Sequence, residues 1–110
     1  MPTLFTRILN REIPAEFLYE DEHVFAIRDI SPQAPFHAII ITKSEIPGIA
    51  DVAEHGDHLA ILNAAKKIAA EHGLDNGYRL VINQGEDGGQ SVPHLHAHLL
   101  GGRKLSWPPG

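Results

Sequence analysis

Three histidines stand at alternate positions late in the chain: His94, His96 and His98, each separated from the next by one apolar residue. Alternate residues of a β-strand point to one side of a sheet, so a strand over residues 94–100 places the three imidazoles on one face, about 7 Å apart. A neutral imidazole can attack an electrophile while a backbone carbonyl or a neighbouring ring orients it. The pattern therefore predicts a nucleophilic site, in preference to three unrelated histidines on a half-exposed strand.

A glycine-rich loop over residues 85–91 precedes this strand and ends in Gln90 and Ser91. Its paired glycines allow backbone N–H groups to converge on an anion, and phosphate is the anion that a nucleophilic histidine would act on. In such a reaction His96 attacks phosphorus and displaces an amine or another leaving group, to which Ser91 or His98 delivers a proton. Water then hydrolyses the bond between phosphorus and histidine.

Zinc binding is the alternative that the histidine pattern leaves open, because two strand histidines at i and i+2 with a third ligand can hold a catalytic zinc ion. A second polar cluster, His55, Asp57 and His58, offers no third strong ligand. We interpret Asp57 as a carboxylate at a helix start and the two histidines as exposed. The sequence therefore predicts no metal site and no cofactor, with histidine-bound zinc as the alternative.

The bulk composition limits the classes of function. The chain has 110 residues, which suits one domain over residues 1–110 with one hydrophobic core. Its nine Lys and Arg residues are scattered and its net charge is -5, so a nucleic-acid partner is disfavoured but a small anion in a local pocket is not. Cysteine is absent, which excludes disulfides and thiolate chemistry.

We expect a cytoplasmic protein with no membrane partner, because residues 1–10 lack the apolar core of a signal peptide and no segment is long enough to span a bilayer.

Hydrophobic periodicity predicts an α+β fold, in which an antiparallel five-stranded sheet carries one main helix and a short N-terminal helix capped by Thr3. The expected helices cover residues 4–9 and 57–72, and the expected strands cover residues 17–19, 24–27, 36–42, 78–83 and 94–100. The helical stripe expected to pack on the sheet consists of Ile61, Leu62, Ala65, Ile68 and Ala69. One main helix leaves a sheet face poorly covered, which favours a dimer.

Two motifs in the chain match one known family. The first runs from Asn83 through Gln90, Ser91 and the three histidines to Gly101, Gly102, Arg103 and Trp107-Pro108-Pro109. The second is Asp29-Ile30-Ser31-Pro32-Gln33-Ala34-Pro35, followed by His37. Together they resemble the Hint branch of the histidine-triad superfamily over nearly the whole chain. The resemblance implies a two-layer α+β subunit that pairs into a homodimer with a continuous sheet, and Pro93 and Arg28 are its departures from the family pattern.

The resemblance also implies residue roles. His96 is the implied nucleophile, and the implied catalytic set also contains His94, His98, His37 and Ser91. Asp29 is expected to hold the ribose hydroxyls, while Asn83 and Ser91 contact the phosphate and the leaving group. The implied nucleotide-binding set is Phe5, Ile8, Ile27, Asp29, Ile30, Asn83, Gly89, Gln90, Ser91, His96, His98 and Trp107. Asp29 also suits a turn, and the apolar members of the set also suit an ordinary core.

The activity that the resemblance implies is hydrolysis of purine nucleoside phosphoramidates through a nucleotidyl-histidine. The expected ligand is a purine nucleoside monophosphate or phosphoramidate, and Trp107 is expected to reach toward the active site of a partner subunit. Hydrolysis of dinucleoside polyphosphates is the first alternative, although the Trp107-Pro108-Pro109 tail speaks against it. A nucleotide-binding scaffold with incidental catalysis is the second alternative.

Overall fold

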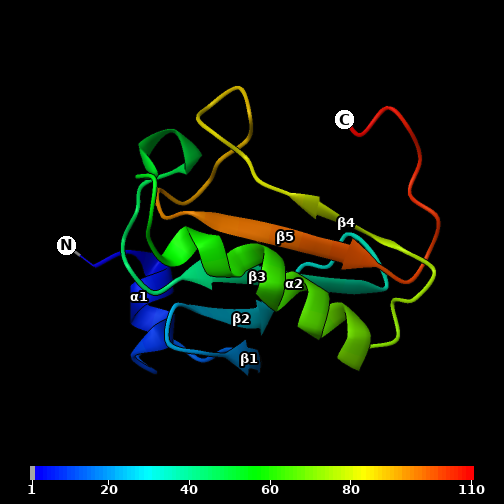
Figure 1. Cartoon of the computed structure of the whole chain (residues 1–110), viewed down its shortest axis with the longest axis horizontal. Helices are drawn as coiled ribbons and strands as arrows, with labels where there is room; N and C mark the ends of the chain where they lie inside the picture. The colour runs from blue at the N-terminus through cyan, green and yellow to red at the C-terminus, as the bar shows by residue number, and fades with distance from the viewer. Residues whose placement is uncertain (1) are drawn as a thin grey trace.

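The computed structural model describes residues 2–110 and shows a five-stranded sheet with two α-helices (Figure 1). All neighbouring strands are antiparallel, so the predicted α+β class is confirmed. The helices are α1 (Leu4–Leu9) and α2 (Ala60–Glu71), with the 3-10 turns η1 (Ile49–Asp51) and η2 (Asp57–Leu59) before α2. The strands are β1 (Phe17–Glu20), β2 (Val24–Arg28), β3 (Phe36–Thr42), β4 (Tyr78–Val81) and β5 (His96–Gly101). Neither helix of this described part is long and apolar enough to cross a membrane.

The strand that carries two of the histidines lies inside the sheet. The strand order is β1-β2-β3-β5-β4, which puts β5 between the central strand β3 and the edge strand β4. All seven residues of β3 are buried, as expected for a run of branched apolar residues with a neighbouring strand on each side. On β3, Ile39 and Ile41 stand opposite His98 and His96. Strand β5 pairs with β3 along its whole length and with β4 from His98 onward, so it is a rigid base for the side chains that it carries.

The two faces of the sheet have different covers. Helix α2 lies across one face (Figure 1), where its buried residues pack on Val24, Ala26, Ala38, Ile40, Ala97 and Leu99. On the other face the alternate strand residues Phe25, Ile27, Ile39 and Ile41 pack with Phe5 and Ile8 of α1. His96 and His98 belong to this second face, because they alternate with the residues under α2. Helix α1 has only six residues, so it covers the histidine face in part.

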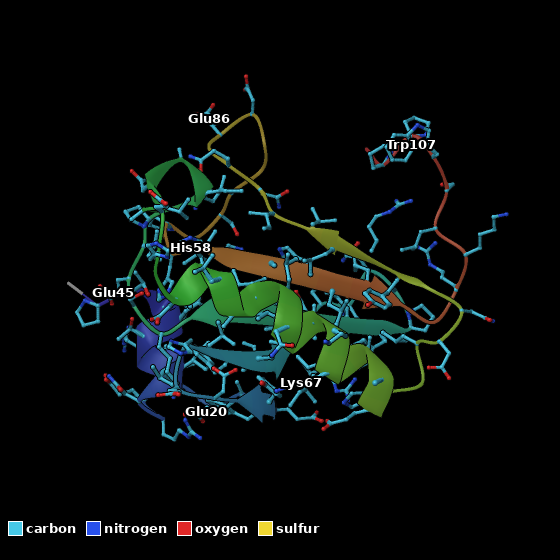
Figure 2. The ribbon with its side chains drawn as sticks, viewed as in Figure 1. Glu20, Glu45, His58, Lys67, Glu86 and Trp107 are labelled. Atoms are coloured by element: carbon cyan, nitrogen blue, oxygen red, sulfur yellow. The ribbon has the colours of Figure 1, made fainter. Side chains whose placement is uncertain are left out.

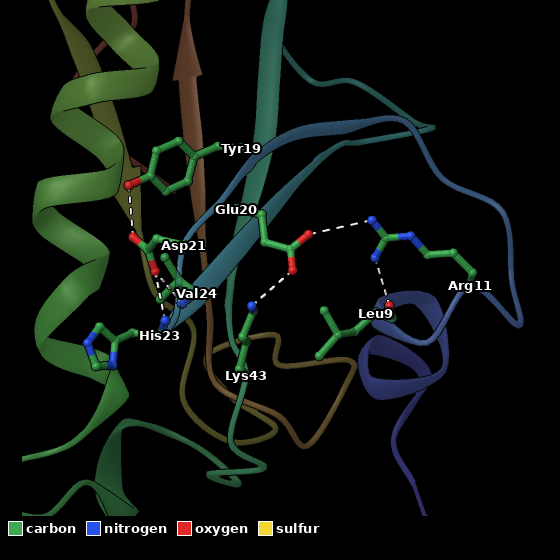
Figure 3. Close-up of polar contacts among 8 residues, drawn as sticks. All are labelled: Leu9, Arg11, Tyr19, Glu20, Asp21, His23, Val24 and Lys43. Atoms are coloured by element: carbon green, nitrogen blue, oxygen red, sulfur yellow. Dashed lines mark hydrogen bonds and ion pairs between the residues drawn. The ribbon is translucent and has the colours of Figure 1, made fainter.

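A single carboxylate holds the tight turn between β1 and β2 (Figure 3). Asp21 accepts hydrogen bonds from the backbone N–H groups of His23 at 2.8 Å and Val24 at 2.9 Å, and from the Tyr19 hydroxyl at 2.8 Å. Side-chain bonds of this kind satisfy backbone donors that no strand reaches. The turn therefore fixes the start of β2, which lies beside β3 in the middle of the sheet.

The main helix begins later than the sequence predicts. Helix α2 starts at Ala60, and Asp57 lies in the 3-10 turn before it. The carboxylate of Asp57 accepts the Ser44 N–H at 3.0 Å and pairs with Nδ1 of His23 at 3.0 Å. Asp57 is the first residue of η2, which runs directly into α2, so it is a first-turn carboxylate as predicted, and it also joins η2 to the segment after β3.

The predicted apolar stripe of α2 is correct at four of its five positions, and Leu62 is the exception. Leu62 is 71% exposed, while Ile61 and Ile68 are buried. Successive helical residues are rotated by about 100°, so Leu62 points away from the sheet when its neighbour points toward it. Ala64 is buried in its place and allows α2 to lie close to the strands.

Two substitutions on α2 test this packing. Ile68 is fully buried, whereas Leu62 is 71% exposed on the same helix. We expect Ile68→Ala to lower the free energy of unfolding by about 2–5 kcal/mol because it leaves a cavity. The matched change Leu62→Ala should alter it by less than about 0.5 kcal/mol. Urea unfolding followed by circular dichroism measures both, and equal losses would contradict the placement of α2.

Candidate active site

Two of the three alternating histidines lie in β5, and the first lies just before it. His96 and His98 are strand residues, whereas His94 precedes the strand. The predicted strand therefore begins two residues too early. The reason is local, since Pro93 has no N–H to offer a neighbouring strand and the His94 N–H donates to the Val92 carbonyl at 2.8 Å.

The three rings nevertheless form one cluster beneath α1. The Phe5 ring lies edge-on to His94 and His96, with centroid separations of 5.8 Å and 4.9 Å. The rings of His96 and His98 are 5.3 Å apart. His94 is fully buried and His96 is 5% exposed, so both rings are largely removed from water.

A backbone carbonyl fixes the tautomer of His96. Nδ1 of this ring lies 2.7 Å from the carbonyl oxygen of His94. A carbonyl oxygen can only accept, so the ring proton is assigned to Nδ1 and the lone pair to Nε2. Desolvation by burial lowers the pKa of His96, which keeps the ring neutral at pH 7. His96 therefore carries a nitrogen that is free, unprotonated and fixed in direction.

His94 is held at both ring nitrogens. Nε2 lies 2.7 Å from the Thr42 carbonyl oxygen, and Nδ1 lies 2.5 Å from the Thr3 hydroxyl. Desolvation also lowers the pKa of His94. Its ring is therefore a neutral support, and its own carbonyl faces His96.

A second chain of hydrogen bonds fixes His98. The Gln33 N–H donates to Nδ1 of His37 at 3.0 Å, so the neutral His37 ring carries its proton on Nε2. That Nε2–H donates to Nδ1 of His98 at 2.9 Å. The proton of His98 is thereby placed on Nε2. Desolvation is the main cause that lowers the pKa of both His37 and His98.

Asp29, His37 and His98 are the described residues whose donor atoms are close enough to hold a metal ion. Their ligand atoms lie within 4.8 Å of one another, and carboxylate with imidazole suits zinc. The hydrogen bonds give the same atoms another explanation. His37 uses Nδ1 for Gln33 and Nε2 for His98, while Asp29 Oδ2 lies 3.4 Å from that Nε2. A metal ion on His37 would have to replace its bond to His98.

The glycine-rich loop closes on itself. The N–H groups of Gly89 and Gln90 donate to the carbonyls of Glu86 and Gly85, both at 3.0 Å. The Gln90 side chain accepts the Gly85 N–H at 2.9 Å and donates to two carbonyls outside the loop at 2.7 and 3.1 Å. These groups brace the loop in this structure and do not converge on an anion. Ser91, the next residue, is exposed.

The other residues predicted to contact the nucleotide differ in how far their side chains are buried. Phe5, Ile8 and Ile27 are buried between α1 and the sheet, while Ile30 is 96% exposed on the loop after β2. Trp107 is 80% exposed near Arg79, at the opposite end of the molecule from Glu45 in the view of Figure 2. The tail that carries Trp107 thus lies beside β4.

Three residues that support the histidines have no chemical signal in the sequence. Thr3 was predicted only as a helix cap, and this role is confirmed because its side chain accepts the Thr6 N–H. Its bond to His94 spans 91 residues. Thr42 and Gln33 act through backbone groups, which every residue type has. Sequence pattern alone therefore could not identify these partners.

Burial of neutral rings makes the stability of the fold depend on pH. Four histidines have pKa values below their ordinary value near 6.5, mainly because of desolvation: His37, His94, His96 and His98. As the pH falls below about 6.5, these histidines take up protons in the unfolded chain before they do so in the folded protein. Acid therefore favours the unfolded state, and the free energy of unfolding decreases until the pH reaches the lower pKa values of the folded protein.

We therefore expect the free energy of unfolding, measured in urea, to fall by at least about 1 kcal/mol between about pH 7.5 and pH 5.5. Exposed His23, whose pKa is raised mainly by its hydrogen bond to Asp57, works in the opposite sense. His94→Gln should flatten the pH slope, and the surface change His55→Gln should preserve it. Stability that rises on acidification would contradict the neutral cluster.

Comparison with known proteins agrees with the fold. The HIT domain model matches residues 10–105. An "uncharacterized HIT-like protein" from Synechococcus elongatus is 53% identical over 98% of this chain and 96% of its own. A "14 kDa zinc-binding protein" from Zea mays is 50% identical over 99% of this chain and 88% of its own.

Solved structures give the same result. A HIT family hydrolase from Legionella pneumophila superposes with a TM-score of 0.94 at 51% identity, covering 99% of this chain and 100% of that one. A histidine triad nucleotide-binding protein from Candida albicans superposes with a TM-score of 0.82 at 30% identity, covering 97% and 83%. The match thus includes the sheet, α2 and the strand that carries the histidines, and the chain belongs to the HIT, or histidine-triad, family.

Proposed function

We propose that the protein, as a member of the Hint branch, hydrolyses purine nucleoside phosphoramidates through a nucleotide bound covalently to Nε2 of His96. The observation that carries this proposal is the 2.7 Å contact between Nδ1 of His96 and the His94 carbonyl oxygen. It leaves Nε2 as the nucleophile, and burial keeps that nitrogen unprotonated.

In the first step Nε2 attacks phosphorus, a phosphorus–nitrogen bond to His96 forms, and the bond to the amine breaks. The ring becomes cationic, and its Nδ1–H then binds the His94 carbonyl more strongly because a charged donor makes a stronger hydrogen bond. The departing amine takes a proton from the hydroxyl of Ser91, which recovers one from solvent. His98 donates its Nε2–H to an oxygen of the phosphoryl group.

In the second step water attacks the same phosphorus atom and the bond to Nε2 breaks. His96 returns to its neutral form, with its proton still on Nδ1. The attacking water releases one proton to solvent, which balances the proton taken up by the amine. Dividing one difficult displacement into two easier ones is the advantage of such a covalent intermediate.

Asp29 is the proposed ribose contact. One of its oxygens accepts the Ser31 N–H at 2.7 Å, so Asp29 also stabilises the turn after β2. The other oxygen lies 3.4 Å from Nε2 of His37, beside the support of His98. A carboxylate held in this way accepts hydrogen bonds from a vicinal diol and places the sugar next to the cluster. Exposed Ile30 beside it offers apolar surface for a base.

The names of related proteins support a nucleotide hydrolase. The matching structures include HIT family hydrolases from Legionella pneumophila and Clostridium thermocellum, and a histidine triad nucleotide-binding protein from Candida albicans. These names specify neither the phosphorus–nitrogen bond nor the base. The phosphoramidate is therefore proposed from the chemistry of the cluster together with the resemblance to the Hint branch.

A homodimer belongs to this proposal. The short strand β4 is a free edge in the single chain, and its Tyr78 is 46% exposed. Pairing of two such edges would extend the sheet and cover unpaired backbone groups. Trp107, which is 80% exposed, would then be available to the partner's site.

Release of AMP from adenosine phosphoramidate of lysine tests the proposed chemistry. We expect His96→Ala to reduce turnover by at least about a thousandfold, because the nucleophile is removed. His55→Ala, a change at an exposed histidine, should keep full activity, and EDTA should have no effect.

Other outcomes identify the alternatives. Loss of activity with EDTA would favour zinc held by Asp29, His37 and His98. Cleavage of a dinucleoside polyphosphate in preference to the phosphoramidate would favour the sister activity. Tight AMP binding without any turnover would favour a nucleotide-binding scaffold.

A further inference from the structure

A polar network joins the start of α1 to the histidine cluster, and neither the sequence motifs nor the proposed chemistry includes it. The Thr3 hydroxyl lies 2.5 Å from Nδ1 of His94 and also accepts the Thr6 N–H at 3.1 Å. Glu45, labelled at the α1 end of the molecule in Figure 2, accepts the Thr3 N–H at 3.1 Å and the Thr6 hydroxyl. We call Thr3, Thr6 and Glu45 the α1 latch.

The partners of each group determine where the protons lie. Nε2 of His94 must donate to the Thr42 carbonyl, which cannot donate in return. In the neutral ring Nδ1 is then an acceptor, so the Thr3 hydroxyl donates to it. Glu45 takes the Thr6 hydroxyl proton. The Thr3 hydroxyl then has two acceptors, Nδ1 of His94 at 2.5 Å and the Thr6 hydroxyl oxygen at 3.3 Å, and the shorter contact to His94 is the stronger hydrogen bond.

His94 in turn sets the direction of the reacting ring. Its carbonyl oxygen is the acceptor of the His96 Nδ1–H. A protonated His94 would place a positive charge beside the ring of His96, which has to become cationic during phosphoryl transfer. A hydroxyl donor on Nδ1 favours the neutral form, whereas a carboxylate there would favour the protonated form.

We infer that Thr3 is a positioning residue for His96. Its hydroxyl closes the first turn of α1 and, with the same atom, holds His94 as the neutral tautomer that carries its proton on Nε2. The folding of α1 is thereby tied to the orientation of the nucleophile, and Phe5, two residues further on, packs against both rings. The effect on turnover rests on the proposed function, whereas the tautomer of His94 does not.

Substitutions at Thr3 separate the cap from the proton donor. Thr3→Ser keeps both roles. Thr3→Asp keeps a good helix cap but presents a carboxylate, which accepts and cannot donate at neutral pH. Thr6→Ala is the control, because it removes a latch hydroxyl that does not contact His94. Glu45 and His96 are the titratable groups that face His94, and all three variants leave them unchanged.

The first readout is the ¹⁵N chemical shifts of the His94 ring in labelled protein at about pH 7. We expect the Nε2–H neutral form in the unaltered protein, in Thr3→Ser and in Thr6→Ala, and a doubly protonated ring in Thr3→Asp. An Nδ1–H tautomer in the unaltered protein, or a neutral ring in Thr3→Asp, would overturn the inference whether or not the protein cleaves phosphoramidates.

The second readout is turnover of the phosphoramidate. Thr3→Asp should lower kcat by about tenfold to a hundredfold with little change in KM, because the nucleophile and not the nucleotide contacts is disturbed. Thr3→Ser should have the same kcat as the unaltered protein. A protonated His94 with unchanged kcat would overturn the positioning role. If even the unaltered protein has no turnover, the proposed function fails, and the ring shifts still decide the tautomer.

Discussion

The hydrogen bond from Nδ1 of His96 to the carbonyl oxygen of His94 is the interaction on which the site depends. It decides which nitrogen of the proposed nucleophile is free. The two residues that form this bond have different environments. His96 is paired with β3 in the sheet, whereas His94 lies two residues earlier, before the strand begins. The sheet fixes the first residue, while Thr42 and Thr3 fix the second.

Burial and hydrogen bonding act together in this cluster. An unpaired polar ring inside a protein costs free energy, so a buried imidazole needs a partner for each nitrogen that water cannot reach. His94 has two such partners, and His37 receives one bond from Gln33 and donates another to His98. The same burial lowers the pKa values of these rings. The neutral form of the proposed nucleophile at pH 7 and the expected loss of stability in acid therefore have one physical cause.

Local pattern predicted the elements better than their contacts. Strand β3 has the predicted bounds, and Thr3 caps α1 as predicted, because periodicity and cap residues are signals within a few positions. Strand β5 starts at His96, two residues after its predicted start, because of Pro93 and the bond from His94 to Val92, which alternation does not encode. Leu62 fitted the helical period but lies beyond the edge of the contact.

The sequence could predict the central residues of the candidate site, which stay a prediction, but not the groups that hold them. His96 and His98 are identified by spacing, and His37 by the resemblance to the Hint branch. The backbone donors and acceptors around them belong to residues such as Gln33 and Thr42, whose side chains carry no signal for that role. The converging N–H groups expected from the glycine-rich loop instead close that loop, as its turn geometry requires for Gly89, which has φ 81°.

The attachment point of the nucleotide tests the central claim most directly. Acid-labile adducts would be trapped by millisecond quenching with alkali during turnover of the phosphoramidate, followed by digestion and mass and ³¹P analysis of the histidine peptide. The account predicts one nucleotidyl group, on Nε2 of His96. Attachment at Nδ1, attachment to another histidine, or full turnover without any adduct would contradict it.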